Sequence, residues 1–194
     1  MKKGRLILIA GHNRASETHP RDCGYAFFNP HNSDTKDNEH WFMERLCVMA
    51  DTILKNRGLK VTLLPFTLSL EEKIKWANEN LTKYDIIVEV HGNAFNNPQA
   101  NGTEVFYVSN GLRSYFYARK LSKIISSTIG TKNRGPKPSK SSHHGGLGII
   151  DQTPSYDFLL ELGFLSNNKD LEKVNKHGAS AIFKTCKYLL ERIS

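Results

Sequence analysis

Short apolar runs alternate with longer segments of helical periodicity along most of the chain, and this alternation narrows the folds that it can adopt. Runs of about four to eight apolar residues have the length of buried strands, whereas an apolar repeat of about 3.6 positions is typical of amphipathic helices. Strands lacking polar alternation are buried on both faces, as in parallel sheets. We therefore expect a single α/β domain over residues 1–194, with a mostly parallel twisted sheet of about six strands and helices on both faces. The pattern predicts strands at 6–10, 59–64, 85–91, 103–108, 147–150 and 157–162, and helices at 38–56, 69–83, 112–129 and 168–192.

One segment interrupts this alternation. Residues 130–146 are rich in Gly, Pro, Ser and Lys, and Gly and Pro in particular break regular elements. Loops of this length inside a compact domain are usually functional or disordered. The sequence therefore predicts a long basic loop before the last strands.

The charge balance restricts the partners of the chain. Its net charge of +8 favours anionic partners such as nucleic acid, anionic membranes or acidic cell-wall polymers. No apolar run approaches the roughly 18 to 20 residues that cross a membrane, and the run at 6–10 is too short for a signal peptide. We expect a protein that is made in the cytoplasm and does not insert into membranes. Three widely spaced cysteines, Cys23, Cys47 and Cys186, do not predict a disulfide framework.

A histidine stands where each of two predicted strands ends. His12 follows the strand at 6–10, and His91 closes the strand at 85–91. Ligands of parallel sheets gather outside the carboxyl ends of strands. We therefore expect both imidazoles at one edge of the sheet.

Glu39 opens the first predicted helix, three residues before Phe42 and seven before Leu46, on the stripe that faces the sheet. A carboxylate that faces a core needs a positive partner, and a metal ion would be one. With His12 and His91, Glu39 makes a His₂Glu set, which catalytic zinc uses while a position stays open for water. The alternatives are hydrogen-bonded histidines at strand ends and a first-turn glutamate that complements the helix dipole.

Glu161 and Glu89 each interrupt an apolar run, and a buried carboxylate is costly unless it is paired or functional. Beside a metal, Glu161 could accept a proton from water as a general base. Glu89 shares a strand face with His91, so it could orient that ligand or pair with a lysine. We rank Glu161 first as the catalytic base.

Four stretches form a recognisable set: IAGH, the glutamate that opens the first helix, EVHGNA followed by NGTEVFY, and LELGFLSN. The set resembles the zinc-dependent N-acetylmuramoyl-L-alanine amidases of type 3, which are peptidoglycan hydrolases, and the resemblance spans nearly the whole chain. In that family the zinc histidines stand in a GH pair and an H-x-N-A pattern. The zinc glutamate lies about nineteen residues before a glycine, and the catalytic glutamate precedes G-F-L-S-N. The matching residues here are Gly11-His12, His91-Gly92-Asn93-Ala94, Glu39 before Gly58, and Glu161 before 163–167.

The resemblance implies an enzyme that hydrolyses the amide between N-acetylmuramic acid and the L-alanine of the stem peptide, with Zn²⁺ as its cofactor. His12, Glu39 and His91 would hold the zinc, and Glu161 would be the general base. The partner would be peptidoglycan, through both its glycan strand and its stem peptide. The basic surface would also draw the enzyme to anionic wall polymers.

Substrate contacts are expected at Asn93 and Ala94, which follow the second zinc histidine, and at His143 and His144 in the basic loop. Lysines and histidines of that loop would bind carboxylates of the stem peptide. We expect a monomer that binds no nucleic acid. It would reach the wall as a phage lysin released by a holin or as an autolysin released on lysis.

The chain departs from the family after the first strand, where GHNRASETHPRDCG replaces the usual GHGG-x-D-x-G, so the family's contacts do not transfer to residues 13–37. Two alternatives stay open. One is a zinc peptidase that cuts another peptide or wall amide, which product analysis would reveal. The other is a non-catalytic basic domain that binds the wall or nucleic acid, the latter marked by salt-sensitive binding without a metal.

Overall fold

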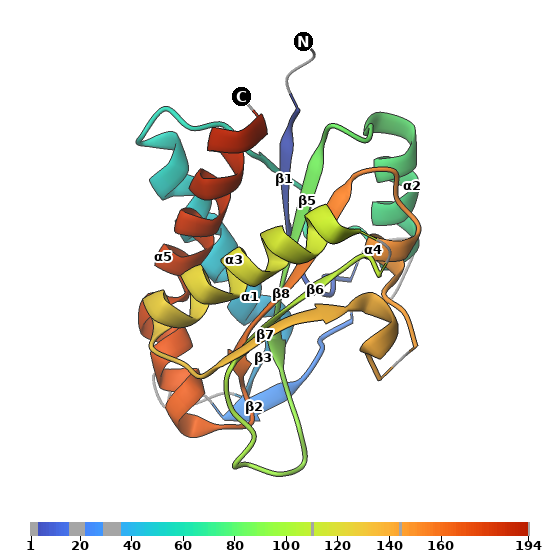
Figure 1. Cartoon of the computed structure of the whole chain (residues 1–194). Coiled ribbons are helices and arrows are strands. Elements are labelled where there is room, and N and C mark those ends of the chain that lie inside the picture. The colour runs from blue at the N-terminus through green and yellow to red at the C-terminus, as the bar shows by residue number, and fades with distance from the viewer. Residues whose placement is uncertain (1–3, 16–21, 29–35, 110, 144, 194) are drawn as a thin grey trace.

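Figure 1 shows the computed structural model, which describes residues 4–15, 22–28, 36–109, 111–143 and 145–193. A separate antiparallel pair joins β2 (Ala26–Phe28) to β3 (Lys36–Asn38). The main sheet comprises β1 (Leu6–Ala10), β4 (Thr62–Leu63), β5 (Ile86–Asn93), β6 (Thr103–Tyr107), β7 (Asn133–Pro138) and β8 (Tyr156–Phe164). The helices are α1 (Glu39–Lys55), α2 (Leu70–Asn80), α3 (Leu112–Ile129), α4 (Gly148–Asp151) and α5 (Asn168–Ile193), with a 3₁₀ turn at Ser139–Ser141.

The main sheet is mostly parallel, as predicted. Its strand order is β4-β1-β5-β8-β6-β7. β1 runs parallel to β4 and β5, β5 to β8, and β6 to β7. Among the described strands of the main sheet, only β6 and β8 form an antiparallel pair. Because β1, β5 and β8 run in one direction, their carboxyl ends lie at one edge, where side chains that follow them can meet.

Helices cover both faces of the sheet, which confirms the predicted layering (Figure 1). One face, with Val88, shares a core with α1, α3 and α5. The other face, with Ile87 and Leu159, shares a second core with α2 and α4. Because successive strand residues point to opposite faces, His91 and Glu161 lie on this second face.

Two predictions near the basic segment were wrong. The expected strand 147–150 is the short helix α4, because the run LGII is too short for periodicity to separate strand from helix. The expected loop 130–146 contains β7 and the 3₁₀ turn. Pro136 and Pro138 are tolerated in β7 because, within the described residues, it pairs with β6 alone, and an edge strand leaves one side of its backbone without strand partners.

The remaining elements follow the sequence pattern closely. Helix α3 has the predicted bounds, and Ser69 and Glu72 form the capping box at the start of α2. The strand expected at 59–64 is reduced to Thr62–Leu63. All three cysteines are free. None of the described helices combines the length and the apolar character needed to span a bilayer.

Candidate metal centre

His12 lies just beyond β1, in a backbone conformation that residues with a side chain rarely adopt. Its φ angle is +62°, in the left-handed region. Nε2 of its imidazole lies 3.1 Å from Oε2 of Glu39. Nδ1 lies 2.7 Å from Oδ2 of Asp22. The sharp turn after β1 therefore aims one ring nitrogen at Glu39, while Asp22 contacts the other.

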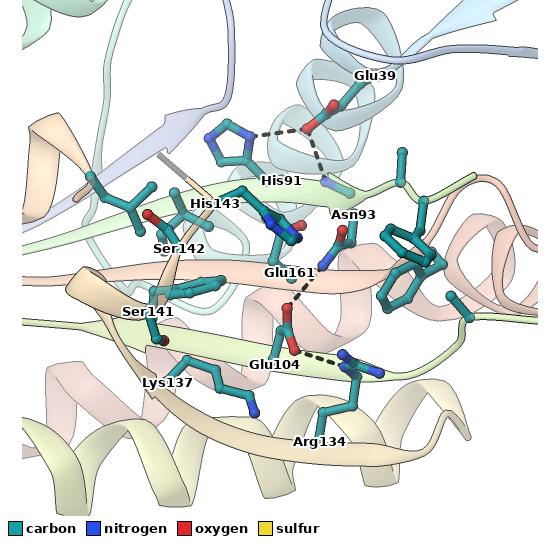
Figure 2. Close-up of a pocket in the computed structure, with 18 of the residues that line it drawn as sticks. Glu39, His91, Asn93, Glu104, Arg134, Lys137, Ser141, Ser142, His143 and Glu161 are labelled. Atoms are coloured by element: carbon teal, nitrogen blue, oxygen red, sulfur yellow. Dashed lines mark hydrogen bonds and ion pairs between the residues drawn. The ribbon is translucent and has the colours of Figure 1, made fainter. Parts of the chain in front are cut away.

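Glu39 is the first residue of α1, and its carboxylate lies between the two histidines. The side chain of Asn38 caps the helix by accepting a hydrogen bond from the Trp41 N–H. Oε1 of Glu39 accepts a hydrogen bond from the Gly92 N–H at 3.1 Å and lies 3.0 Å from Nδ1 of His91 (Figure 2). The same carboxylate can thus complement the helix dipole and face both imidazoles.

His91 projects from β5 next to Glu39. The pairing of β5 with β8 shifts register between His91 and Asn93, as at a β-bulge. Nε2 of His91 lies 3.5 Å from Oε2 of Glu89. Glu89 is buried, and its Oε1 lies 3.7 Å from Nζ of Lys73. Both contacts considered for Glu89, with a histidine and with a lysine, are therefore present.

The charges of the three side chains depend strongly on one another. Although burial disfavours its charged form, hydrogen bonds to both histidines hold the pKa of Glu39 well below its usual value. Burial also opposes protonation of His91, but Glu39 and Glu89 raise its pKa well above the ordinary histidine value. Against burial, Glu39 raises the pKa of His12 as well. In the metal-free protein, the carboxylates favour the protonated form of both imidazoles, and a bound cation could replace those protons.

The geometry fits a bound metal ion. Donor atoms of His12, Glu39 and His91 all lie within 4.8 Å of one another. Gly24 keeps the adjoining space open, because a Cβ there would lie 2.5 Å from Nε2 of His12 and 2.7 Å from Oε2 of Glu39. Its φ of +60° also favours glycine. Two imidazole nitrogens and one carboxylate form a donor set of catalytic zinc sites.

Glu161 lies beside His91 on the neighbouring strand. The two are direct partners in the β5–β8 pairing, and Glu161 also lies opposite Glu104 of β6. Burial raises the pKa of the Glu161 carboxyl to about 8, although the positive charge of His91 opposes this. Within the described part of the chain, no hydrogen-bond partner reaches its Oε2. Such a carboxyl can take up and release a proton.

A cleft of about 940 Å³ joins these groups. Figure 2 shows it along β5, β8, β6 and β7. The predicted substrate residues Asn93, Ala94 and His143 line the cleft, whereas His144 lies outside the described residues. The basic segment forms one wall, through Arg134, Pro136, Lys137, Pro138, Ser141, Ser142 and His143.

Two acids that the sequence analysis did not single out also belong to the site. Oε1 of Glu104 accepts a hydrogen bond from Nδ2 of Asn93 at 2.9 Å, and Oε2 accepts one from Nε of Arg134 at 2.7 Å (Figure 2). Glu104 interrupts the apolar strand TEVFY, so the criterion of an acid in a strand would have found it. Asp22 interrupts no strand, and its signal was the D-x-G that ends the family's first motif, which Asp22-Cys23-Gly24 matches.

Solved structures share this fold. The catalytic domain of the CD27L endolysin targeting Clostridia Difficile is 23% identical, with a TM-score of 0.72 and 97% of each chain covered. The catalytic domain of CwlV, an N-acetylmuramoyl-L-alanine amidase from Bacillus (Paenibacillus) polymyxa var. colistinus, is 24% identical, with a TM-score of 0.73 and coverage of 96% of this chain and 98% of that one. An N-acetylmuramoyl-L-alanine amidase from Clostridium difficile 630 is 19% identical, with a TM-score of 0.74 and 98% of each chain covered.

Comparison of the sequence with family models identifies the family of this chain. A comparison with curated proteins found no match. The profile of the family described as N-acetylmuramoyl-L-alanine amidase matches residues 6–185, which is nearly the entire chain. The chain therefore belongs to the N-acetylmuramoyl-L-alanine amidase family of peptidoglycan hydrolases.

Proposed function

We propose that this chain hydrolyses the amide bond between N-acetylmuramic acid and L-alanine in peptidoglycan, with Zn²⁺ held by His12, Glu39 and His91 and with Glu161 as the general base. Membership of the amidase family supports the class of bond. The observation that supports the mechanism is the convergence of three candidate ligands within 4.8 Å, next to a carboxyl on the neighbouring strand whose Oε2 has no hydrogen-bond partner among the described residues.

Each of the two imidazoles would be held in one tautomer by a further carboxylate. Asp22, 2.7 Å from Nδ1 of His12, would accept its proton and leave Nε2 free to bind the metal. Glu89, 3.5 Å from Nε2 of His91, would act in the same way and leave Nδ1 facing Glu39. A bound zinc ion supplies a Lewis acid, which acidifies water and stabilises negative charge on a carbonyl oxygen.

Glu161 would move the protons of the reaction. Its pKa of about 8 belongs to the metal-free protein, and a divalent cation beside it would lower that value below the working pH, which leaves the carboxylate ionised. A carboxylate whose pKa lies near the working pH can accept the proton of the attacking water. It can then donate a proton to the leaving amine of L-alanine.

The walls of the cleft suit an anionic polymer. Lys137 and His143 line it on the β7 side, and Asn93 and Ala94 line it beside the ligand His91. We assign these four residues to contacts with the stem peptide, the two basic ones to its carboxylates. The net charge of +8 would favour approach to a wall that carries acidic polymers. The likeness to an endolysin catalytic domain supports a lytic role, as a phage lysin or a bacterial autolysin.

Digestion of purified peptidoglycan, with and without a zinc chelator, tests this function. Mass spectrometry should detect stem peptides that begin with L-alanine, together with intact glycan strands, only when the chelator is absent. Cleavage at a different amide would keep the metal-dependent chemistry and overturn the assigned bond. Absence of cleavage by zinc-loaded protein would overturn the proposal as a whole.

A further inference from the structure

Lys73 of α2 is a buried lysine that the mechanism above does not use. It is 2% exposed, whereas lysines are almost never buried unless they are paired. Its Nζ donates hydrogen bonds to the backbone carbonyls of Ala10 at 3.1 Å and His12 at 2.7 Å. It also lies 3.7 Å from Oε1 of Glu89. The ammonium group therefore joins the turn after β1 to the middle of β5.

The hydrogen bond from Lys73 to the His12 carbonyl involves a residue with a strained backbone. The left-handed backbone of His12, with φ of +62°, is unfavourable for a residue with a Cβ and persists only where the surroundings enforce it. Lys73 bonds the carbonyl of this residue, and the neighbouring Gly11 N–H donates to the carbonyl of Val90 at 2.8 Å. Release of the His12 carbonyl would allow the turn to relax and the imidazole to swing away from Glu39.

The second contact reaches the other histidine. Glu89 is 4% exposed, and its Oε2 lies 3.5 Å from Nε2 of His91. A buried carboxylate stays ionised only if a positive group balances it, and Lys73 is such a group in addition to His91. The ammonium group of Lys73 thus contacts the backbone of His12 and also Glu89, which in turn contacts His91.

We propose that Lys73 is a positioning residue of the metal centre, which holds His12 in its strained turn and, through Glu89, fixes the ring of His91. The proposal rests on the metal site of the proposed function. It assigns to α2 a direct part in the shape of the site, although no residue of α2 is a candidate ligand.

The direction in which zinc affinity changes in Lys73→Met distinguishes a positioning role from an effect of charge or of fold stability. Lys73 is a cation close to a site for a divalent cation, so its charge alone repels zinc. If charge were its only effect, Lys73→Met would strengthen zinc binding. If the residue only stabilised the fold, Lys73→Met would lower the melting temperature and leave zinc affinity unchanged. Positioning alone predicts weaker zinc binding by a protein that is still folded.

The experiment measures the zinc dissociation constant of the purified, metal-free full chain by competition with a chromophoric chelator. Loss of a group that orients metal ligands typically weakens metal binding about 10- to 100-fold, and we expect this for Lys73→Met. The matched control is Lys75→Met on the same helix, whose side chain is 74% exposed and should not affect zinc binding. Unchanged or tighter zinc binding by a folded Lys73→Met variant would overturn the proposal.

A second pair of variants covers the case in which Lys73→Met leaves Glu89 unbalanced and the protein unfolds. Glu89→Gln keeps the bonds of Lys73 to the His12 turn, whereas Lys73→Met/Glu89→Gln loses them without a buried unpaired charge. The double variant should bind zinc about tenfold or more weakly than Glu89→Gln alone. Equal affinities would reject the role of Lys73. A wild-type chain that binds no zinc would instead refute the metal centre itself.

Discussion

Zinc binding to the metal-free protein at pH 7 should release about two to three protons. Metal ligands must be deprotonated, and a bound cation also favours the ionised form of a carboxyl beside it, so protons that these groups carry beforehand are displaced. Three groups of the site carry such protons. Against burial, carboxylates raise the pKa of His91 well above the ordinary value and also raise that of His12. Burial raises the pKa of Glu161 to about 8.

The size of the effect follows from these values. An ordinary histidine with a pKa of about 6.5 carries about a quarter of a proton at pH 7, so two of them would release about half a proton. Glu161, with a pKa of about 8, carries about nine-tenths of a proton at this pH. Both histidines should carry more of a proton than an ordinary histidine, because carboxylates raise the pKa of each of them. Zinc affinity should therefore rise about 10²- to 10³-fold per pH unit near pH 7.

Isothermal titration calorimetry in buffers of different ionisation enthalpy counts the released protons directly. The Glu161→Gln variant should release about one proton fewer, because the amide does not titrate. A count of about half a proton in the Glu161→Gln variant would show that the histidines behave as ordinary ones. That result would refute the coupling of both imidazoles to Glu39, on which the site depends.

Three substitutions test other parts of the molecule. Glu161→Gln should slow peptidoglycan hydrolysis about 10²- to 10⁴-fold and change zinc affinity by less than about tenfold; full activity would remove Glu161 from the chemistry. Gly24→Ala should weaken zinc binding by about tenfold or more in a chelator competition, because its Cβ would lie 2.5 Å from Nε2 of His12; wild-type affinity would contradict this geometry. Burial raises the pKa of Asp157 to about 7, so the folded chain binds this proton more tightly than the unfolded chain and loses stability as the pH rises from 3.8 through about 7. Across that range, the free energy of unfolding of Asp157→Asn, measured in urea, should therefore rise by about 4 kcal/mol relative to that of the wild type. A difference between the two proteins that does not vary with pH would exclude this role.

The candidate ligands and Glu161 could be predicted from sequence because each is a polar residue next to, or within, a regular apolar pattern. His12 follows β1, Glu39 opens α1, and His91 and Glu161 interrupt apolar runs near the ends of β5 and β8. Such positions depend on local pattern, and a parallel sheet then gathers the carboxyl ends of its strands at one edge. The α/β class, the mostly parallel sheet and the helices on both faces follow from the same alternation.

Local pattern failed where the position of a segment in the sheet outweighed its composition. Prolines at 136 and 138 argue against a strand, yet this segment forms β7, because an edge position needs fewer backbone hydrogen bonds. The four residues of α4 gave no periodic signal, and their packing against α2 and β8 decides their place.

Some contacts around the candidate metal centre depend on the folded chain alone. Lys73 stands in LEEKIKW, where it resembles any solvated helix lysine, yet it bonds a carbonyl 61 positions away. Asp22 likewise reaches His12 only after the turn beyond β1 has formed, whereas the contact of Glu89 with His91 follows from their shared strand face. Hydrogen bonds and ion pairs require atoms to approach within a few ångströms. Spacing along the chain sets which residues share a face, whereas packing sets which distant side chains come that close.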